Sequence, residues 1–69
     1  MIEIKINTDI IKLDSFLKWC GAACLGSEAK IYILNGDVKV NGEVETRRGK
    51  KLTYGDTVEI NGEIYKLIN

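Results

Sequence analysis

The chain has 69 residues, of which 45% are hydrophobic and 29% are charged, and ten Lys and Arg balance ten Asp and Glu. It is too short for two domains of ordinary size, because typical domains have about 100 to 150 residues. A net charge of zero excludes a global positive field that would attract nucleic acid, so an electrostatic argument must rest on local clusters. The chain has no histidine, which excludes Ser-His-Asp and Cys-His catalytic sets.

The N-terminal part predicts a strand followed by a helix. Isoleucine alternates with charged residues over 2–6, the period of a half-buried strand, and Asn-Thr-Asp at 7–9 then supplies turn chemistry. Apolar side chains next recur at i, i+3, i+4 and i+7, which is typical of one face of an amphipathic helix. The residues on this face are Leu13, Phe16, Leu17 and Cys20.

A second helix is predicted over 28–35. Gly21 ends the first helix, and the hydroxyl of Ser27 is expected to cap the start of the second. Gly36 fits the left-handed position just past its end. We expect its apolar residues, Ile31 among them, to pack into the core.

The C-terminal half predicts short strands joined by tight turns. Asn41-Gly42 lies between the alternating segments 38–40 and 43–45, and Asn61-Gly62 lies between 57–60 and 63–68. Asn-Gly between alternating segments is the strongest short hairpin signal. The predicted fold class is therefore α+β, with two helices packed on a small, mostly antiparallel sheet, in a single domain over 1–69.

Two cysteines, Cys20 and Cys24, are four residues apart. This spacing differs from the CxxC redox motif, and without histidine the pair cannot complete a metal site. We expect both to be reduced and packed on the interior side of the helix end. No phosphate-binding glycine loop and no catalytic acid-base pair is recognisable, so the sequence predicts neither an enzyme nor a cofactor. It contains no apolar stretch near the roughly 20 residues of a membrane span and no signal-peptide pattern, so we expect a cytosolic protein.

Four positive charges and no negative one are concentrated in the five residues 47–51. Such groups can each bind a phosphate oxygen, and the release of counterions then makes binding favourable and dependent on salt. The plain alternative is a solvated loop. Lys30 and Lys39 could extend the patch, with Ser27 at a helix start as a phosphate seat, although each is equally compatible with an ordinary surface role. Tyr32 could stack on a base or pack in the core, and Trp19 is expected at the edge of the core.

Three segments of the chain resemble the alpha-L RNA-binding motif of small-subunit ribosomal protein S-four. They are Leu13-Asp14-Ser15-Phe16-Leu17-Lys18, Gly26-Ser27-Glu28-Ala29-Lys30 and Gly36-Asp37-Val38-Lys39-Val40-Asn41-Gly42, followed by the basic run. The resemblance covers about two thirds of the chain and is greatest to stand-alone bacterial members of roughly 70 residues. At Gly26 the chain departs from the many members that carry a basic residue there.

The resemblance implies non-catalytic binding of structured RNA, often ribosomal RNA, in ribosome assembly or translation. We expect a monomer whose partner is structured RNA, with the ribosome or assembly factors as further partners. Carried over by position, the contact surface comprises Ser27, Lys30, Lys39, Asn41, Arg47, Arg48, Lys50 and Lys51. Of these, Asn41 is chiefly explained by the turn that it makes with Gly42. Two alternatives stay open: a protein-interaction module that keeps this fold, and a small thiol-redox protein that uses the two cysteines.

Overall fold

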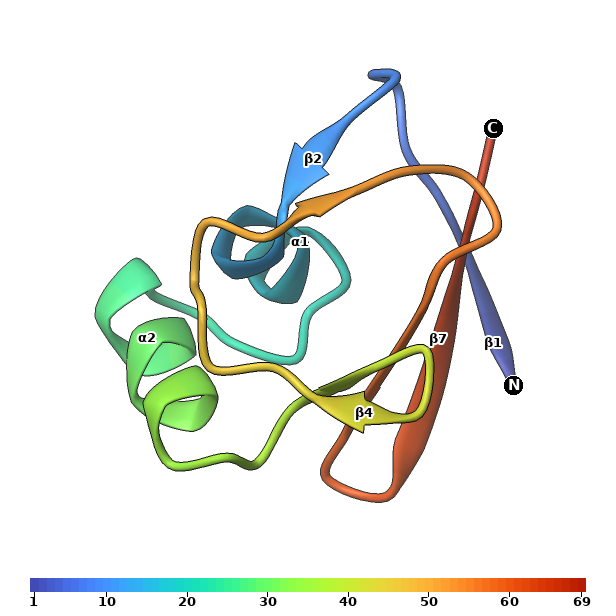
Figure 1. Cartoon of the computed structure of the whole chain (residues 1–69). Coiled ribbons are helices and arrows are strands. Elements are labelled where there is room, and N and C mark those ends of the chain that lie inside the picture. The colour runs from blue at the N-terminus through green and yellow to red at the C-terminus, as the bar shows by residue number, and fades with distance from the viewer.

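The computed structural model describes all 69 residues and has two helices packed on a mostly antiparallel sheet, which confirms the α+β class (Figure 1). In chain order the elements are β1 (Ile2–Lys5), β2 (Ile11–Lys12), α1 (Leu13–Trp19), α2 (Gly26–Leu34), β3 (Lys39–Val40), β4 (Glu43–Val44), β5 (Lys51–Leu52), β6 (Thr57–Ile60) and β7 (Glu63–Ile68). Neither helix is long and apolar enough to cross a membrane.

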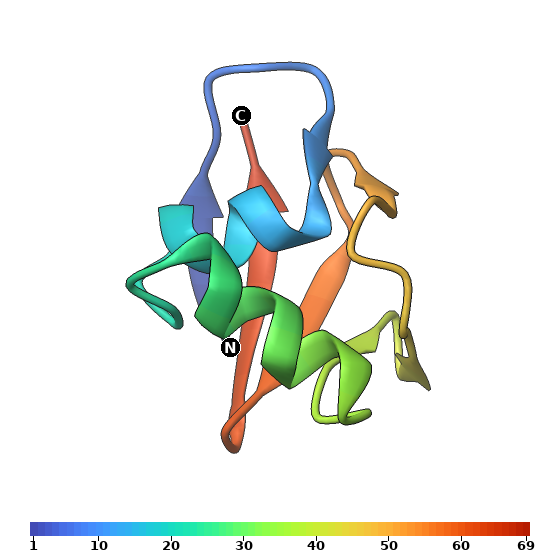
Figure 2. The same cartoon turned by 90° about the vertical axis from the view of Figure 1, so that its left-hand side faces the viewer.

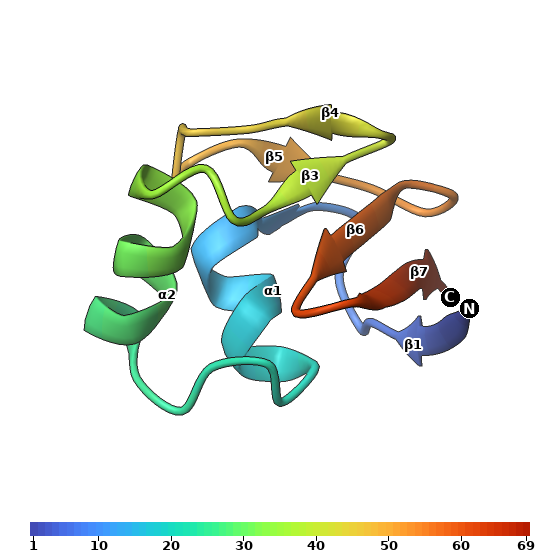
Figure 3. The same cartoon turned by 90° about the horizontal axis from the view of Figure 1, so that it is seen from below.

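The strands form one large sheet and one small ribbon. The large sheet has the order β1-β7-β6-β3-β4, in which only the β1–β7 pair is parallel. The ribbon pairs β2 with β5 in antiparallel orientation, which the sequence did not predict. Figure 3 shows both helices on the same side of β1, β7 and β6, so the opposite face of the large sheet is uncovered.

Both Asn-Gly turns form as predicted. Asn41 and Gly42 have φ angles of 52° and 86°, and Asn61 and Gly62 have φ angles of 54° and 79°. Two successive positive φ angles define the type I′ turn, whose twist matches that of the flanking strands. These turns join β3 to β4 and β6 to β7, and so set the register within two hairpins that supply four of the five strands in the large sheet.

The core lies between the helices and the inner faces of the large sheet and the ribbon, and contains thirteen buried apolar residues. In α1, Leu13, Phe16 and Leu17 are fully buried, as predicted. The ring of Phe16 meets that of Tyr65 edge-on, with the ring centroids 6.5 Å apart. The inner face of the ribbon adds Leu52, so the ribbon closes one side of the core.

The prediction that Ile31 packs into the core is wrong. Its side chain is 58% exposed, and that of Leu34 is 59% exposed. Helix α2 buries only Ala29 and Ile33, which are four residues apart on one stripe. Ile31 is two residues from each of them, about 200° around the helix, and therefore points to solvent.

The start of α2 also differs from the prediction. The helix begins at Gly26, and Leu25 occupies the N-cap position without a side-chain hydrogen bond. Ser27 is thus already inside the first turn and does not cap the helix. Instead the Glu28 carboxylate accepts a hydrogen bond from the Cys24 backbone N–H at 3.0 Å, which fixes the entry to the helix.

The residues around the end of α1 match their predictions in part. Cys24 is exposed, which contradicts the expected interior position, whereas Cys20 is half-buried and this burial raises the pKa of its thiol. Trp19 was expected at the edge of the core, but its side chain is 52% exposed and is not among those packed against the core; its Nε1 donates to the Lys5 carbonyl at 2.8 Å. Tyr32 packs against the core with partial exposure.

Candidate nucleic-acid interface

The loop that carries the basic run is fixed to the start of α1 by backbone hydrogen bonds. The N–H of Leu13 donates to the carbonyl of Lys50 at 2.8 Å, and the N–H of Asp14 donates to the carbonyl of Arg48 at 3.1 Å. The first N–H groups of a helix have no partner within the helix, so the loop satisfies two of them. Residues 47–51 are therefore held on a hydrogen-bonded frame although most of them lie outside regular strands.

Arg47 is neutralised within the protein. Its Nε and Nη2 donate to the Glu45 carboxylate at 3.0 and 3.1 Å, and its backbone N–H donates to the same carboxylate at 3.1 Å. This is the one salt bridge of the molecule. The Glu45 side chain is 13% exposed and that of Arg47 is 73% exposed. The hydrogen bonds from Arg47 lower the pKa of Glu45 from 4.5 to about 2, and Glu45 in turn raises the pKa of Arg47.

The other three cations of the run have no carboxylate partner, but they do not point the same way. Arg48 and Lys51 are exposed, whereas Lys50 is half-buried. Successive side chains of a strand point to opposite sides, so Lys51 on β5 faces away from the side of its neighbour Lys50. Lys50 accordingly turns toward the β3–β4 hairpin, where it lines a hollow.

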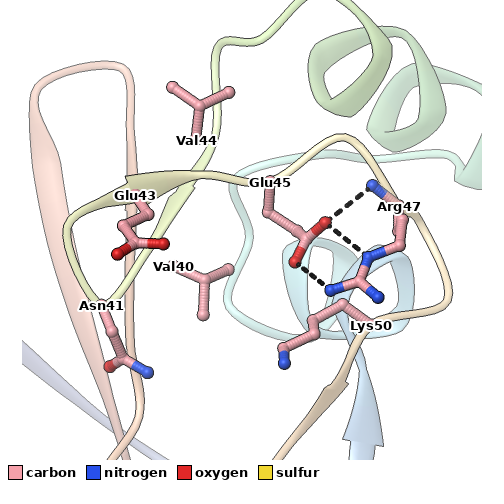
Figure 4. A pocket seen from close by; sticks show the side chains of 7 residues that line it. All are labelled: Val40, Asn41, Glu43, Val44, Glu45, Arg47 and Lys50. Atoms are coloured by element: carbon pink, nitrogen blue, oxygen red, sulfur yellow. Dashed lines mark hydrogen bonds and ion pairs between the residues drawn. The ribbon is translucent and has the colours of Figure 1, made fainter.

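This hollow has a volume of about 290 Å³ and is lined by residues of the β3–β4 hairpin and the basic loop. Figure 4 shows the Glu45 carboxylate facing the guanidinium of Arg47, with Lys50 beside Val40. The lining comprises Val40, Asn41, Glu43, Val44, Glu45, Arg47 and Lys50. The lining thus contains two acidic and two basic side chains, so the hollow itself is not a purely cationic binding site for phosphate.

Asn41 is held by the protein itself. Its Nδ2 donates to the Asp56 carboxylate at 3.2 Å, and its Oδ1 accepts from the Thr57 N–H at 2.9 Å. These bonds tie the β3–β4 turn to the start of β6. A side chain used in this way has little hydrogen-bonding capacity left for a ligand, which favours the structural explanation of Asn41.

Besides Asn41, three predicted residues outside the basic loop lie in two places. Ser27 and Lys30 are exposed on α2, three residues apart and hence on neighbouring turns of one face. Figure 2 shows α2 in front with the β4–β5 loop beside it, so helix and loop are accessible from one side. Lys39 lies elsewhere: its neighbour Val40 faces the core, so Lys39 points to the uncovered face of the large sheet, opposite Val44 and Glu59.

A comparison with known families decides the classification. The model of the S4 domain matches residues 4–68, nearly the whole chain. The chain belongs to the S4 domain family. This confirms the resemblance inferred from the sequence, since the alpha-L motif is the motif of this family.

Relatives of the same size support the assignment of this S4 domain. The chain is 44% identical over 59 residues to the Bacillus subtilis (strain 168) protein named "Probable ribosome maturation protein RlbA", with 86% of this chain and 83% of that protein covered. It is 40% identical over 58 residues to YbcJ of Escherichia coli (strain K12), with 84% and 83% covered.

Solved structures agree with the fold. The solution structure of Escherichia coli YbcJ, described as revealing an alpha-L motif involved in RNA-binding, superimposes with a TM-score of 0.75 at 34% identity, covering all of this chain and 89% of that one. The 30S ribosomal protein S4e from Thermoplasma acidophilum superimposes with a TM-score of 0.65 at 26% identity, covering 87% of this chain and 32% of that one.

One cation beside the basic loop of this S4 domain was not predicted from the sequence. Lys12 on β2 lies directly opposite Lys51 on β5, although 39 residues separate the two in the chain. In the sequence, Lys12 is an ordinary polar residue before a helix. Only the pairing of β2 with β5 places it beside the basic loop.

Proposed function

We propose that this S4 domain binds structured RNA without catalysing a reaction, and that residues 1–69 act as one RNA-binding domain. The observation that supports this proposal is the basic loop of residues 47–51, whose backbone is hydrogen-bonded to the start of α1. It exposes Arg48 and Lys51, which have no carboxylate partner, in a chain whose net charge is zero. A loop whose backbone is already fixed loses little conformational freedom on contact with a fixed array of phosphates, which favours structured RNA as the ligand.

The relatives support ribosomal RNA as the target. A motif involved in RNA-binding is described for YbcJ, ribosome maturation is named for RlbA, and S4e is a ribosomal protein. By analogy, the chain acts in the maturation of a ribosomal subunit, in the cytoplasm and as a monomer. Its contact surface combines Arg48, Lys50 and Lys51 with Ser27 and Lys30 of α2. Arg47 lies at its margin, Lys39 lies outside it on the uncovered face of the large sheet, and Asn41 supports the turn.

The proposal is tested by two variants that each remove three positive charges. The first replaces Arg48, Lys50 and Lys51 by alanine and leaves the Glu45–Arg47 pair in place. The matched control replaces Lys5, Lys18 and Lys66, which lie on β1, α1 and β7. In a filter-binding assay with end-labelled fragments of small- and large-subunit ribosomal RNA, the first variant should lose affinity by at least tenfold more than the control.

The same two variants are then expressed in cells, and the RNA that each one binds is identified by crosslinking and sequencing. A discrete ribosomal RNA site should be enriched with the unaltered chain and with the control, and lost with the loop variant. Equal binding by both variants would remove the loop from the interface. An absence of RNA enrichment with the unaltered chain would overturn the proposed function itself.

One observation favours a second candidate, a protein-interaction module. Ile31 and Leu34 expose apolar surface on α2, next to Lys30 on the same helix. An apolar protein interface responds weakly to salt, whereas phosphate contacts respond steeply. Partner binding that survives high salt and is lost in the Ile31→Ser, Leu34→Ser variant would favour this second candidate.

A further inference from the structure

The ribbon of β2 and β5 brings two like charges face to face. Its register pairs Ile11 with Leu52 and Lys12 with Lys51. Leu52 is buried and Ile11 half-buried, so the apolar pair faces the core and the two lysines face solvent. Like charges directly opposite each other on neighbouring strands destabilise a sheet. The arrangement therefore costs the free protein some stability.

The backbone pattern makes this pair a close one. The N–H of Leu13 donates to the carbonyl of Lys50. Leu13 and Lys50 follow Lys12 and Lys51 on the ladder, so this following pair is at a hydrogen-bonded position. Hydrogen-bonded and non-hydrogen-bonded pairs alternate in antiparallel strands, which places Lys12 and Lys51 at a non-hydrogen-bonded position. At such positions the Cα atoms are only about 4.5 Å apart and the side chains are closer than elsewhere on the ladder.

No salt bridge of the protein offsets this repulsion. The one salt bridge of the molecule joins Glu45 to Arg47, and no carboxylate pairs with Lys12 or Lys51. Asp14, two residues after Lys12, accepts a hydrogen bond from the N–H of Ser15 at 2.7 Å. The two ammonium groups are thus left without a counter-charge, on a ribbon whose backbone continues directly into the basic loop.

We propose that Lys12 and Lys51 together form a binding site for one phosphate group of the RNA backbone. The inference rests on the proposed function and adds Lys12 and the β2–β5 ribbon to its interface. One phosphate placed between the two ammonium groups accepts hydrogen bonds from both and replaces their repulsion by two attractions. Because both ammonium groups contact a phosphate and not a base edge, the site positions the RNA without reading its sequence.

Lys12→Glu separates this role from a structural one. In the free protein the substitution turns the repulsion across the strands into an attraction. The melting temperature should therefore rise at low salt, and the rise should shrink at high salt. In the filter-binding assay with ribosomal RNA fragments, the same variant should lose affinity at least tenfold. A variant that is more stable and yet binds less cannot owe its loss to unfolding.

Lys18→Glu is the matched control, because Lys18 is an exposed lysine in the last turn of α1. It should lose much less affinity than Lys12→Glu. In a cycle of alanine variants, Lys12→Ala and Lys51→Ala should each lose several-fold, and the double variant should lose less than the product of the two. Shared contact with one phosphate makes the losses non-additive.

The possible failures are distinct. Equal losses for Lys12→Glu and Lys18→Glu, with the unaltered chain binding RNA, would overturn the two-lysine site and leave the proposed function standing. Fully multiplicative losses in the alanine cycle would show that the lysines hold separate groups, and would also overturn it. An unaltered chain that binds no RNA would overturn both proposals.

Discussion

The side chains of the basic run differ in what the protein leaves them free to do. Arg47 is paired with Glu45, Lys50 is half-buried beside acids, and Arg48 and Lys51 are exposed without an acidic partner. The number of charges in a sequence run therefore overstates the charge available to a ligand. Neighbouring acids and the direction of each side chain decide how much of it remains.

Arg48→Ala should weaken RNA binding more than Arg47→Ala. Removing Arg48 deletes an uncompensated charge, and the slope of log affinity against log salt should fall by about one. Removal of Arg47 leaves Glu45 without its partner but deletes a charge that was already neutralised. Salt titrations of the two variants with the same RNA check this order, and equal slopes would contradict it.

Glu45 should titrate well below its ordinary range. Its pKa in the folded protein is about 2, against an ordinary value of 4.5, so the pair stabilises the fold at pH values above about 4.5. That contribution is lost as the pH falls from about 4.5 toward 2, since protonation removes the acceptor charge. Because Arg47 is largely exposed, solvent screening keeps the gain small.

Carbon-detected NMR of the Glu45 side chain measures this pKa directly. In Arg47→Ala the pKa should return toward 4.5, because both the side-chain hydrogen bonds and the charge of Arg47 are gone. An unshifted Glu45 in the unaltered chain would show that the pair does not persist in solution.

Substitutions of Asn41 and Asn61 compare the free-energy cost of losing a turn residue with that of also losing a tertiary hydrogen bond. Both begin type I′ turns with φ near 50°, but only Asn41 makes side-chain hydrogen bonds, to Asp56 and Thr57. Asn61→Ala should cost about 1 kcal/mol for the left-handed backbone. Asn41→Ala should cost at least about 1 kcal/mol more for its hydrogen bonds. Urea unfolding of both variants measures the difference, and equal costs would refute a tertiary role for Asn41.

At the scale of elements, α2 shows why periodicity alone misplaces residues. Apolar residues occur all around this helix, at 29, 31, 33 and 34, but only Ala29 and Ile33 are buried. A helix on the surface of a small domain can bury one stripe, and its remaining apolar residues stay exposed. In α1, by contrast, the apolar residues follow one stripe and all three main members are buried.

This contrast predicts different stability effects for two similar substitutions. Leu17→Ala removes a fully buried side chain and should cost about 2 to 5 kcal/mol, enough to unfold a domain of this size. Ile31→Ala changes an exposed side chain and should shift the free energy of unfolding by no more than about 0.5 kcal/mol. Urea unfolding monitored by Trp19 fluorescence compares them, and a large effect of Ile31→Ala would place that residue in an interface.

At the scale of the whole molecule, a neutral chain presents a locally basic surface. Glu3, Glu59 and Glu63 lie on β1, β6 and β7, and no acid lies within the run 47–51, so the total charge does not describe the loop. Within a Debye length of about 8 Å at physiological salt, a ligand senses mainly the charges closest to it.

The RNA affinity should therefore depend on salt as it does for a basic protein. If four phosphates are contacted, log affinity should fall against log salt with a slope of about 3 to 4. The measurement is a filter-binding titration from low to physiological salt with a single ribosomal RNA fragment. A slope near zero would contradict phosphate contact by the loop and would favour the apolar surface of α2 as the binding face.

The sequence by itself determined the features that depend on local chemistry. Alternation and Asn-Gly turns placed β6, β7 and both hairpins, because type I′ turns need particular residues at particular positions. The i, i+3, i+4 pattern placed α1, and the density of Lys and Arg located the loop. The resemblance of the chain to the alpha-L motif predicted the S4 domain family.

Tertiary structure decided what depends on residues far apart in the chain. Pairing of β2 with β5 brought Lys12 to Lys51, and packing on a single stripe left Ile31 in solvent. Glu28 instead of Ser27 fixed the start of α2, and Asn41 bound Asp56 across the sheet. None of these follows from a local pattern, because each depends on which groups the folded chain brings within a few ångströms of one another.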